Sequence, residues 1–410
     1  MRLLVLLCIL LVGMTQAAPT TDTTNATTSD NFKAPSFTTR TLWSIISSSV
    51  LTLFACVYTA IHPNIPSPKH SAHLHDIWRQ LRMVIMALIA PELIVAWAMR
   101  QWFSADKTHS FFVLMGGFML YVNGKPHRTA SRTLQPDHIL TLIRQRCIDV
   151  PILTADQIHD RSKGNAISKG LVILQVAWFV MQLITRAIYR LETTQLEVGT
   201  LAFAVLNFLT YAAWWDKPLN VQCPHPVYWK STKSKPIMTP EYHIGYVCAS
   251  TNDIAQFGIL APVLRPILEL IGFPGIPTSR KLQVPTFDGS IELEQLHKHV
   301  LLLAGVLMAT IFGGIHCMAW FFAFPTYQER VLWRMSAVAI TCTPWLGLLT
   351  APLLAALDAS LTWFILLYVP YIMLYITARG VLLVLMFTTL RDLPHDAYQT
   401  VLWTSLVPHL

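Results

Sequence analysis

The stretch "LIAPELIVAW", residues 88–97, is an apolar run with a proline and a glutamate near its centre. It lies within a longer apolar segment, residues 82–100, which is about the length that a helix needs to cross the hydrocarbon core of a bilayer. An ionisable side chain such as Glu92 is costly at that depth, about 2.5–3.5 kcal/mol for comparable charged groups, so it tends to face a cavity and to serve a function. The stretch therefore predicts a membrane-spanning helix that carries a functional acid.

The composition of the whole chain agrees with a membrane protein. Of the 410 residues, 53% are hydrophobic and only 13% are charged, whereas soluble domains carry about 25% charged residues. The formal net charge of +8 could suggest a nucleic-acid partner. The Lys and Arg residues are, however, scattered between the apolar runs and do not form one basic stripe, which is typical of residues that flank membrane helices. We therefore expect the lipid bilayer, and no nucleic acid, as a partner.

Counting the apolar runs predicts the architecture. We expect an all-α integral membrane protein, with a single transmembrane domain over residues 42–390 and a tail over residues 391–410. The segment 257–273 is interrupted by prolines and charges, so it suits a re-entrant or interfacial element, although an eighth span is conceivable there. The last long run could be tilted, or broken around Arg379. The bundle should contain about seven helices, near residues 42–61, 82–100, 170–188, 198–215, 300–323, 335–357 and 360–388.

The N-terminal residues predict entry into the secretory pathway. Residues 1–18 have a single Arg, a short apolar core and small residues before the end, as a cleaved signal peptide has; an uncleaved anchor helix is the alternative. Residues 19–41 are polar at first and rich in Thr, and Asn25 begins a glycosylation acceptor. We expect a lumenal N-terminus in a membrane of the endoplasmic reticulum or another secretory compartment.

The positive-inside rule gives a mixed answer for this topology. With a lumenal N-terminus and seven spans, the segments 101–169 and 216–299 fall on the lumenal side, yet both are rich in Lys and Arg. Loops of this length weaken the rule. A disulfide among the loop cysteines Cys147, Cys223 and Cys248 is possible if these loops are lumenal.

Glu92 is the first candidate for acid chemistry. Pro91 precedes it, removes a backbone hydrogen bond and tends to kink the helix, which opens space. Burial disfavours the charged form of a carboxyl group, which leaves a neutral acid that can donate a proton. The alternative is a protonated glutamate that bonds to a neighbouring helix and holds the bundle together.

Asp216 is the second candidate acid. It follows two tryptophans in the sequence "WWDKP", residues 214–218. Aromatic faces stabilise a positive centre by about 2 kcal/mol when water is excluded, so an acid between indole rings suits cation chemistry. The alternative is an interfacial anchor of two tryptophans with an ion pair between Asp216 and Lys217 at the helix end.

Other polar residues carry weaker signals. Asp156 and Asp160 would share one helical face and could hold Mg²⁺ with a diphosphate, but no second acidic cluster is found, so a capped helix start is favoured. No metal site and no cofactor are therefore predicted. His316 and Arg379 lie within apolar runs and are either hydrogen-bonded interior groups or, together with Glu92, the lining of one polar pocket.

Three stretches carry a resemblance: "LWSIISSSVLTLFACVYTAIHPNIP" (42–66), "DRSKG" (160–164) and "TLAFAVLNFLTYAAWWDKPLNVQCPHPV" (200–227). They resemble a family of fungal polytopic membrane proteins that is similar to the membrane-bound terpene cyclases of meroterpenoid pathways, the ascofuranone and macrophorin type. The resemblance covers most of residues 40–390, although none of its motifs is a catalytic signature. It implies a metal-independent enzyme that protonates an epoxide or alkene of a prenylated aromatic substrate and so starts a ring-closing cation cascade.

Under this hypothesis the candidate residues take defined roles. Glu92 or Asp216 would supply the proton, and the substrate would be a hydrophobic prenylated small molecule. A proton-coupled transporter and a seven-helix receptor are the alternatives; a transporter is disfavoured because the sequence shows no internal repeat and no matching pair of broken helices. The residues expected to bind the substrate and shield its cation are Trp97, Trp178, Tyr211, Trp214, Trp215, His316 and Arg379.

Overall fold

The computed structural model describes most of the chain between residues 37 and 401. The predicted signal peptide, Asn25 and most of the segment 257–273 lie outside the described residues. Residues 42–390, expected to form one helical domain, divide between two compact units: unit 1 comprises Met1–Thr59, Ala166–Asn207 and Val306–Leu410, and unit 2 comprises Ala60–Asn165 and Phe208–Gly305. The described residues are 37–66, 73–105, 107–122, 125–126, 136–162, 166–230, 270, 284, 293–357 and 361–401.

Among the described residues, six helices are long and apolar enough to cross a membrane, and they coincide with six of the seven predicted spans. Many large apolar side chains on these helices are exposed, among them Phe54, Leu349 and Val384, as expected of surfaces that face lipid. Of the two alternatives for the last long run, a tilt or a break around Arg379, the structure excludes the break, because the last helix runs through Arg379 without interruption. The six helices are α2 (Leu42–Ala60), α8 (Ala166–Ile188), α9 (Gln195–Ala213), α12 (Gln295–Cys317), α13 (Tyr327–Ala356) and α14 (Leu361–Thr388).

The remaining predicted span, residues 82–100, is broken. Helix α3 (His73–Ile89) and helix α4 (Pro91–Ser104) meet at Ala90 with a bend of 112°. Pro91 stands at the start of α4, where its missing N–H and fixed φ favour a helix beginning. The kink expected at Pro91 is therefore confirmed in position, but it is a break between two helices. Counted as one span, the pair would raise the number of candidate spans to seven.

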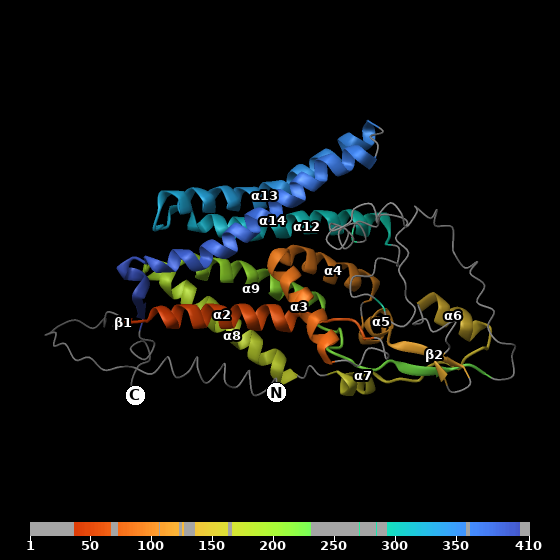
Figure 1. Cartoon of the computed structure of the whole chain (residues 1–410). Coiled ribbons are helices and arrows are strands. Elements are labelled where there is room, and N and C mark those ends of the chain that lie inside the picture. Colours follow the sequence, from red (N-terminus) through yellow and green to blue (C-terminus); the bar gives the residue numbers. More distant parts are fainter. Residues whose placement is uncertain are drawn as a thin grey trace, which may run out of the picture. The chain divides into compact units, whose positions relative to one another are not determined.

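Unit 1 brings the two ends of the described chain together. Strand β1 (Phe37–Thr39) pairs antiparallel with strand β5 (Gln399–Val401), with Phe37 opposite Val401. The chain reaches β5 from α14 through two 3-10 turns, η3 (Thr389–Arg391) and η4 (His395–Tyr398). A further 3-10 turn, η2 (Met318–Phe321), ends α12. Helices α13 and α14 pack against each other (Figure 1).

Unit 2 contains a small sheet, so the expectation of an all-α fold is too simple. Its strand order is β3-β2-β4, and β2 runs parallel to β4 but antiparallel to β3. Gly116, at a φ of 81°, follows the end of a short helix and lets the chain turn into β2. The elements are β2 (Phe118–Val122), β3 (Lys125–Pro126), β4 (His225–Tyr228), α5 (Thr108–Leu114), α6 (Pro136–Arg144) and α7 (Ala155–Arg161), several of which are visible in Figure 1.

A hydrophobic core holds this part of unit 2 together. It combines side chains from α5, α6, α7 and the sheet with Ile65, which follows α2. The backbone N–H of Ile65 donates to the carbonyl of Met115, and the N–H of His225 donates to the carbonyl of Gly117. These bonds fix the segment after α2 and the segment before β4 to the same turn. The buried members include Phe112, Met115, Leu120, Ile148, Ile158 and Val227.

Candidate functional site

The chain turns sharply after the C-terminal end of α9. This turn buries two of four neighbouring side chains and exposes the other two. The backbone N–H of Lys217 donates to the carbonyl of Trp214 at 3.1 Å. Trp214 and Lys217 are buried, at 0% and 2% exposure, whereas Trp215 and Asp216 are exposed. The predicted acid Asp216 thus lies at the surface of the chain. Its neighbour Lys217 is buried instead.

Lys217 is held by an amide and an indole ring. Its Nζ donates to Oε1 of Gln101 at 2.9 Å, and Nε1 of Trp214 donates to the same oxygen at 3.0 Å. The Nζ also lies 4.4 Å from the centre of the Trp214 ring, a cation–π distance. No acidic side chain among the described residues pairs with Lys217. Burial therefore holds the pKa of Lys217 well below its usual range.

We define the lysine cluster as Gln101, Trp214, Lys217 and His62, and the ring of Tyr211 lies next to it. The ring centre of His62 lies 5.8 Å from that of Trp214 and 6.4 Å from that of Tyr211. His62 is buried, and its Nδ1 lies 2.9 Å from the carbonyl oxygen of Ala60, at the end of α2. The cluster therefore joins the segment after α2, helix α4 and the end of α9.

A second contact fixes the same turn to the predicted "DRSKG" stretch. The Oγ of Ser162 accepts from the backbone N–H of Leu219 at 2.9 Å. A guanidinium nitrogen of Arg161 lies 3.2 Å from Nδ1 of His225. Burial, and then the nearby charge of Arg161, lower the pKa of His225. Because His62 also lies against Trp214, all three stretches that carry the family resemblance are thus linked by contacts.

Helix α7, which carries Asp156 and Asp160, begins with a capping box. The Oγ1 of Thr154 accepts from the N–H of Gln157 at 3.3 Å, and the Gln157 side chain accepts from the N–H of Thr154 at 3.1 Å. This capping box confirms the predicted capped helix start, with Asp156 in its first turn. Within the described ranges, no group of three or more His, Cys, Asp or Glu side chains could hold a metal ion.

Glu92 lies in the first turn of α4 and is half-buried. Its side chain therefore begins beside the free backbone N–H groups of the first helical turn. Further along the same helix, Trp97 is fully buried and Gln101 belongs to the lysine cluster. Helix α4 therefore connects the candidate acid to the end of α9.

Two predicted residues come together in unit 1. Arg379 is 2% exposed, and its guanidinium carbon lies 3.5 Å from the centre of the Phe312 ring. His316, one turn after Phe312, places Nδ1 2.9 Å from the Phe312 carbonyl oxygen. Trp178 is half-buried on α8. Since Glu92 belongs to unit 2, a common pocket of Glu92, His316 and Arg379 stays a prediction.

The model of a protein family of unknown function, DUF8562, matches residues 5–107 and 104–257, more than half of the chain. The chain belongs to this family. No curated protein and no solved structure matches it. The matched residues of this DUF8562 protein include α4, α9 and the turn that buries Lys217.

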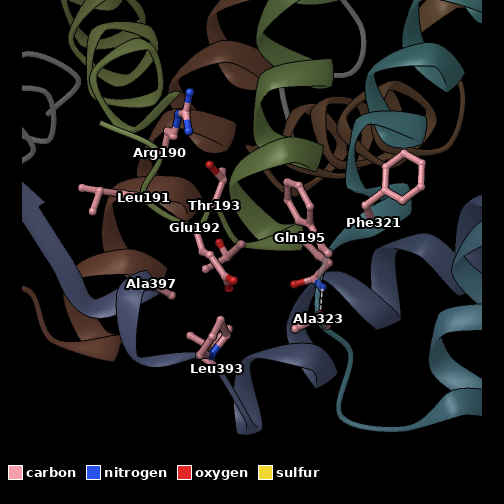
Figure 2. A pocket seen from close by; sticks show the side chains of 12 residues that line it. Arg190, Leu191, Glu192, Thr193, Gln195, Phe321, Ala323, Leu393 and Ala397 are labelled. Atoms are coloured by element: carbon pink, nitrogen blue, oxygen red, sulfur yellow. Dashed lines mark hydrogen bonds between the residues drawn. The ribbon is translucent and has the colours of Figure 1, made fainter. Parts of the chain in front are cut away.

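A pocket that the sequence did not indicate lies in unit 1 of this DUF8562 protein. Its volume is about 230 Å³, and the start of α9 borders it (Figure 2). The side chain of Gln195 donates to the carbonyl of Ala323 at 2.7 Å and so ties two of its walls together. Residues 190–195, 321–323 and three residues between 393 and 397 line it. The spacing of Thr194 and Glu197, three residues apart, is that of a capping box and could have predicted this helix start from the sequence.

The buried charges at the start of α9 are matched. Nη1 of Arg40 lies 2.5 Å from Oε1 of Glu197, and the Thr194 N–H and hydroxyl both donate to Oε2 of Glu197. Arg186 donates to backbone carbonyls, including that of Gln399 at 2.7 Å. These bonds join β1, the end of α8, the start of α9 and β5 of the DUF8562 protein.

Proposed function

We propose that this DUF8562 protein is a membrane-embedded terpene cyclase that protonates an epoxide or alkene of a prenylated aromatic substrate. The observation that supports it is the composition of α4, which carries half-buried Glu92 in its first turn, buried Trp97 beyond it, and Gln101 bonded to Trp214. One candidate acid and three of the aromatic residues expected to shield a cation, Trp97, Tyr211 and Trp214, thus belong to one unit.

The proposed chemistry is an isomerisation. Glu92 gives its proton to the epoxide oxygen, the carbon–oxygen bond opens, and the resulting carbocation is attacked by the next double bond to close a ring. Loss of a proton to a base ends the cascade, so the product has the mass of the substrate. Aromatic faces and the exclusion of water protect the cation. The step uses no metal and no organic cofactor.

The location of the enzyme follows from its proposed substrate. A prenylated aromatic compound partitions into the bilayer through its isoprenoid tail, so a multi-pass protein can bind it from the membrane. We place the protein in a membrane of the secretory pathway, with a cleaved signal peptide, a lumenal N-terminus and a glycan on Asn25.

A proton-coupled transporter is the second candidate, and the break between α3 and α4 favours it. Transporters often bind substrates at discontinuous helices, with the starts of half-helices directed at the ligand. Glu92 at the start of α4 suits such a role. Among the described residues one bent pair occurs, whereas inverted repeats usually provide two.

A feeding experiment separates the two functions. The protein is produced in a heterologous fungus that receives farnesylated phenolic epoxides, and extracts are searched for isomers of unchanged mass. The cyclase proposal expects a new isomer from at least one substrate, and Asp216→Asn should retain it because Asp216 is exposed. Sealed vesicles are tested for uptake of the same compounds driven by a proton gradient. Uptake without any isomer would favour the transporter and reject the cyclase.

A further inference from the structure

The ends of the described chain constrain the number of membrane crossings. Strands β1 and β5 are hydrogen-bonded neighbours, so both lie on the same side of any membrane that the bundle spans. The hydrocarbon core is about 30 Å thick, and hydrogen-bonded strands cannot pair across it. The chain between β1 and β5 must therefore cross an even number of times. Among the described residues, the six continuous spans satisfy this condition, whereas those six together with the bent pair as a seventh do not.

A second contact shows which candidate span does not cross the membrane. Arg40, before α2, forms the ion pair with Glu197 at the start of α9. The candidate spans that the described chain contains between them are α2, the bent pair of α3 and α4, and α8. Helices α2 and α8 together return the chain to its starting side. The pair of α3 and α4 must then begin and end on the same side of the membrane.

Helix α3 has a surface suited to lipid. Met83 and Ala87 are buried on one face, whereas Ile77, Leu81 and Ile85, spaced four residues apart, form an exposed apolar stripe at 50%, 41% and 46% exposure. Trp78 and Arg82 are exposed next to the stripe. Trp and Arg beside an apolar stripe are typical of helices that lie at the boundary between lipid headgroups and acyl chains.

We propose that α3 and α4 form a re-entrant hairpin, whose exposed α3 stripe lies against the lipid of one leaflet and whose turn is at Ala90. The described part of the chain then has six crossing helices. This proposal does not depend on the cyclase activity. It places the exposed residues after α4, such as Lys107, on the side of the membrane opposite to β1.

This topology resolves the conflict over the basic loops. If the N-terminus is lumenal, the Lys- and Arg-rich segments 101–169 and 216–299 become cytosolic, as the positive-inside rule expects. Cys147 and Cys223, one in each segment, are free thiols, which suits the reducing cytosol.

Labelling of single cysteines with a membrane-impermeant maleimide in sealed microsomes tests the proposal. The full chain carries one cysteine at a time, at the exposed positions Thr39→Cys or Lys107→Cys, or the native Cys223. Lys107→Cys and Cys223 should react from one side, and Thr39→Cys should react only after permeabilisation. Reaction of Lys107→Cys from the same side as Thr39→Cys would overturn the hairpin, as would equal reaction from both sides.

Two further measurements keep the test decisive. Leu81→Cys, on the proposed lipid stripe, should stay at least tenfold less reactive than Lys107→Cys until detergent removes the lipid, and equal rates in intact membranes would reject the lipid contact. If the single-cysteine chains do not fold, Cys223 is labelled in the native chain, with Cys223→Ser as the control. Protection of Cys223 on the side where the Thr39 segment is protected would again overturn the proposal.

Discussion

The two ends of helix α9 each bury a charged side chain, and they differ in how that charge is matched. At the start, Glu197 pairs with Arg40 at 2.5 Å and accepts two bonds from Thr194. After the end, Lys217 bonds to a neutral amide of Gln101 and lies over an indole ring. Both charges have the sign that the helix dipole favours at their end.

The difference indicates different roles. The matched charges at the start of α9 satisfy one another and join four segments of unit 1, so they serve the architecture. The cluster after the end keeps a lysine at 2% exposure without an acidic partner among the described residues, which costs free energy of folding. That cost falls where α4, the helix with Glu92, meets the end of α9. We interpret this end as the one that supports function.

The largest effect on stability should come from a substitution at the start of α9, where the buried charges are paired. Glu197→Ala leaves the Arg40 guanidinium without its anion in a buried site, so we expect the free energy of unfolding to fall by about 3–5 kcal/mol. Thermal unfolding in detergent measures this, with Glu192→Ala, an exposed glutamate of the preceding loop, as the control. A loss below 1 kcal/mol for Glu197→Ala, on the order of a surface ion pair, would remove the distinction between the two ends.

Removing Gln101, the acceptor that Trp214 and Lys217 share, should have the next largest effect on stability. Gln101→Leu leaves Nε1 of Trp214 and Nζ of Lys217 without their common acceptor, and a buried unsatisfied donor costs about 1–3 kcal/mol. We expect a loss of about 2–3 kcal/mol in the same unfolding assay. The exposed Gln328→Leu on α13 should change stability little. Equal stability of the two variants would show that Gln101 does not hold the cluster.

Removing the unmatched charge should have the smallest effect at neutral pH. Lys217→Met keeps the length of the side chain and leaves Gln101 bonded to Trp214, while it removes the cost of a buried ammonium group. We expect stability within about 1 kcal/mol of the wild type, or higher. A loss of 3 kcal/mol or more, as expected for breaking a buried ion pair, would mean that Lys217 is as well matched as Glu197.

The pH dependence of stability distinguishes the wild-type chain from Lys217→Met. The pKa of Lys217 is lower in the folded chain than its usual value of about 10.4, so the unfolded chain binds more protons between the two values. The free energy of unfolding should rise with pH in that window, by at most about 1.4 kcal/mol per pH unit, and the folding cost should be full below it. Lys217→Met should lack this rise. An identical slope in both chains contradicts the buried, unmatched amine.

The sequence predicted the long elements better than the local ones. Six spans follow from apolar length alone, and Pro91 correctly placed the break. The pairing of β2 with β4 was not predictable, because it joins residues more than a hundred positions apart in parallel. Asp216 was chosen as an acid beside Lys217, but the tight turn closed by the bond from the Lys217 N–H to the Trp214 carbonyl leaves Asp216 exposed and Lys217 buried. Such a turn has no clear sequence signal.

The most direct test of the account is the rate of isomer formation by Glu92→Gln relative to Glu294→Gln in the same membranes. Glu294 is an exposed glutamate of unit 2, so the two variants replace the same carboxyl group in different surroundings. A positioned general acid contributes about 10²–10⁴-fold to a rate, and we expect a loss in that range for Glu92→Gln with Glu294→Gln unchanged. Similar rates for both variants would contradict the claim that Glu92 supplies the proton.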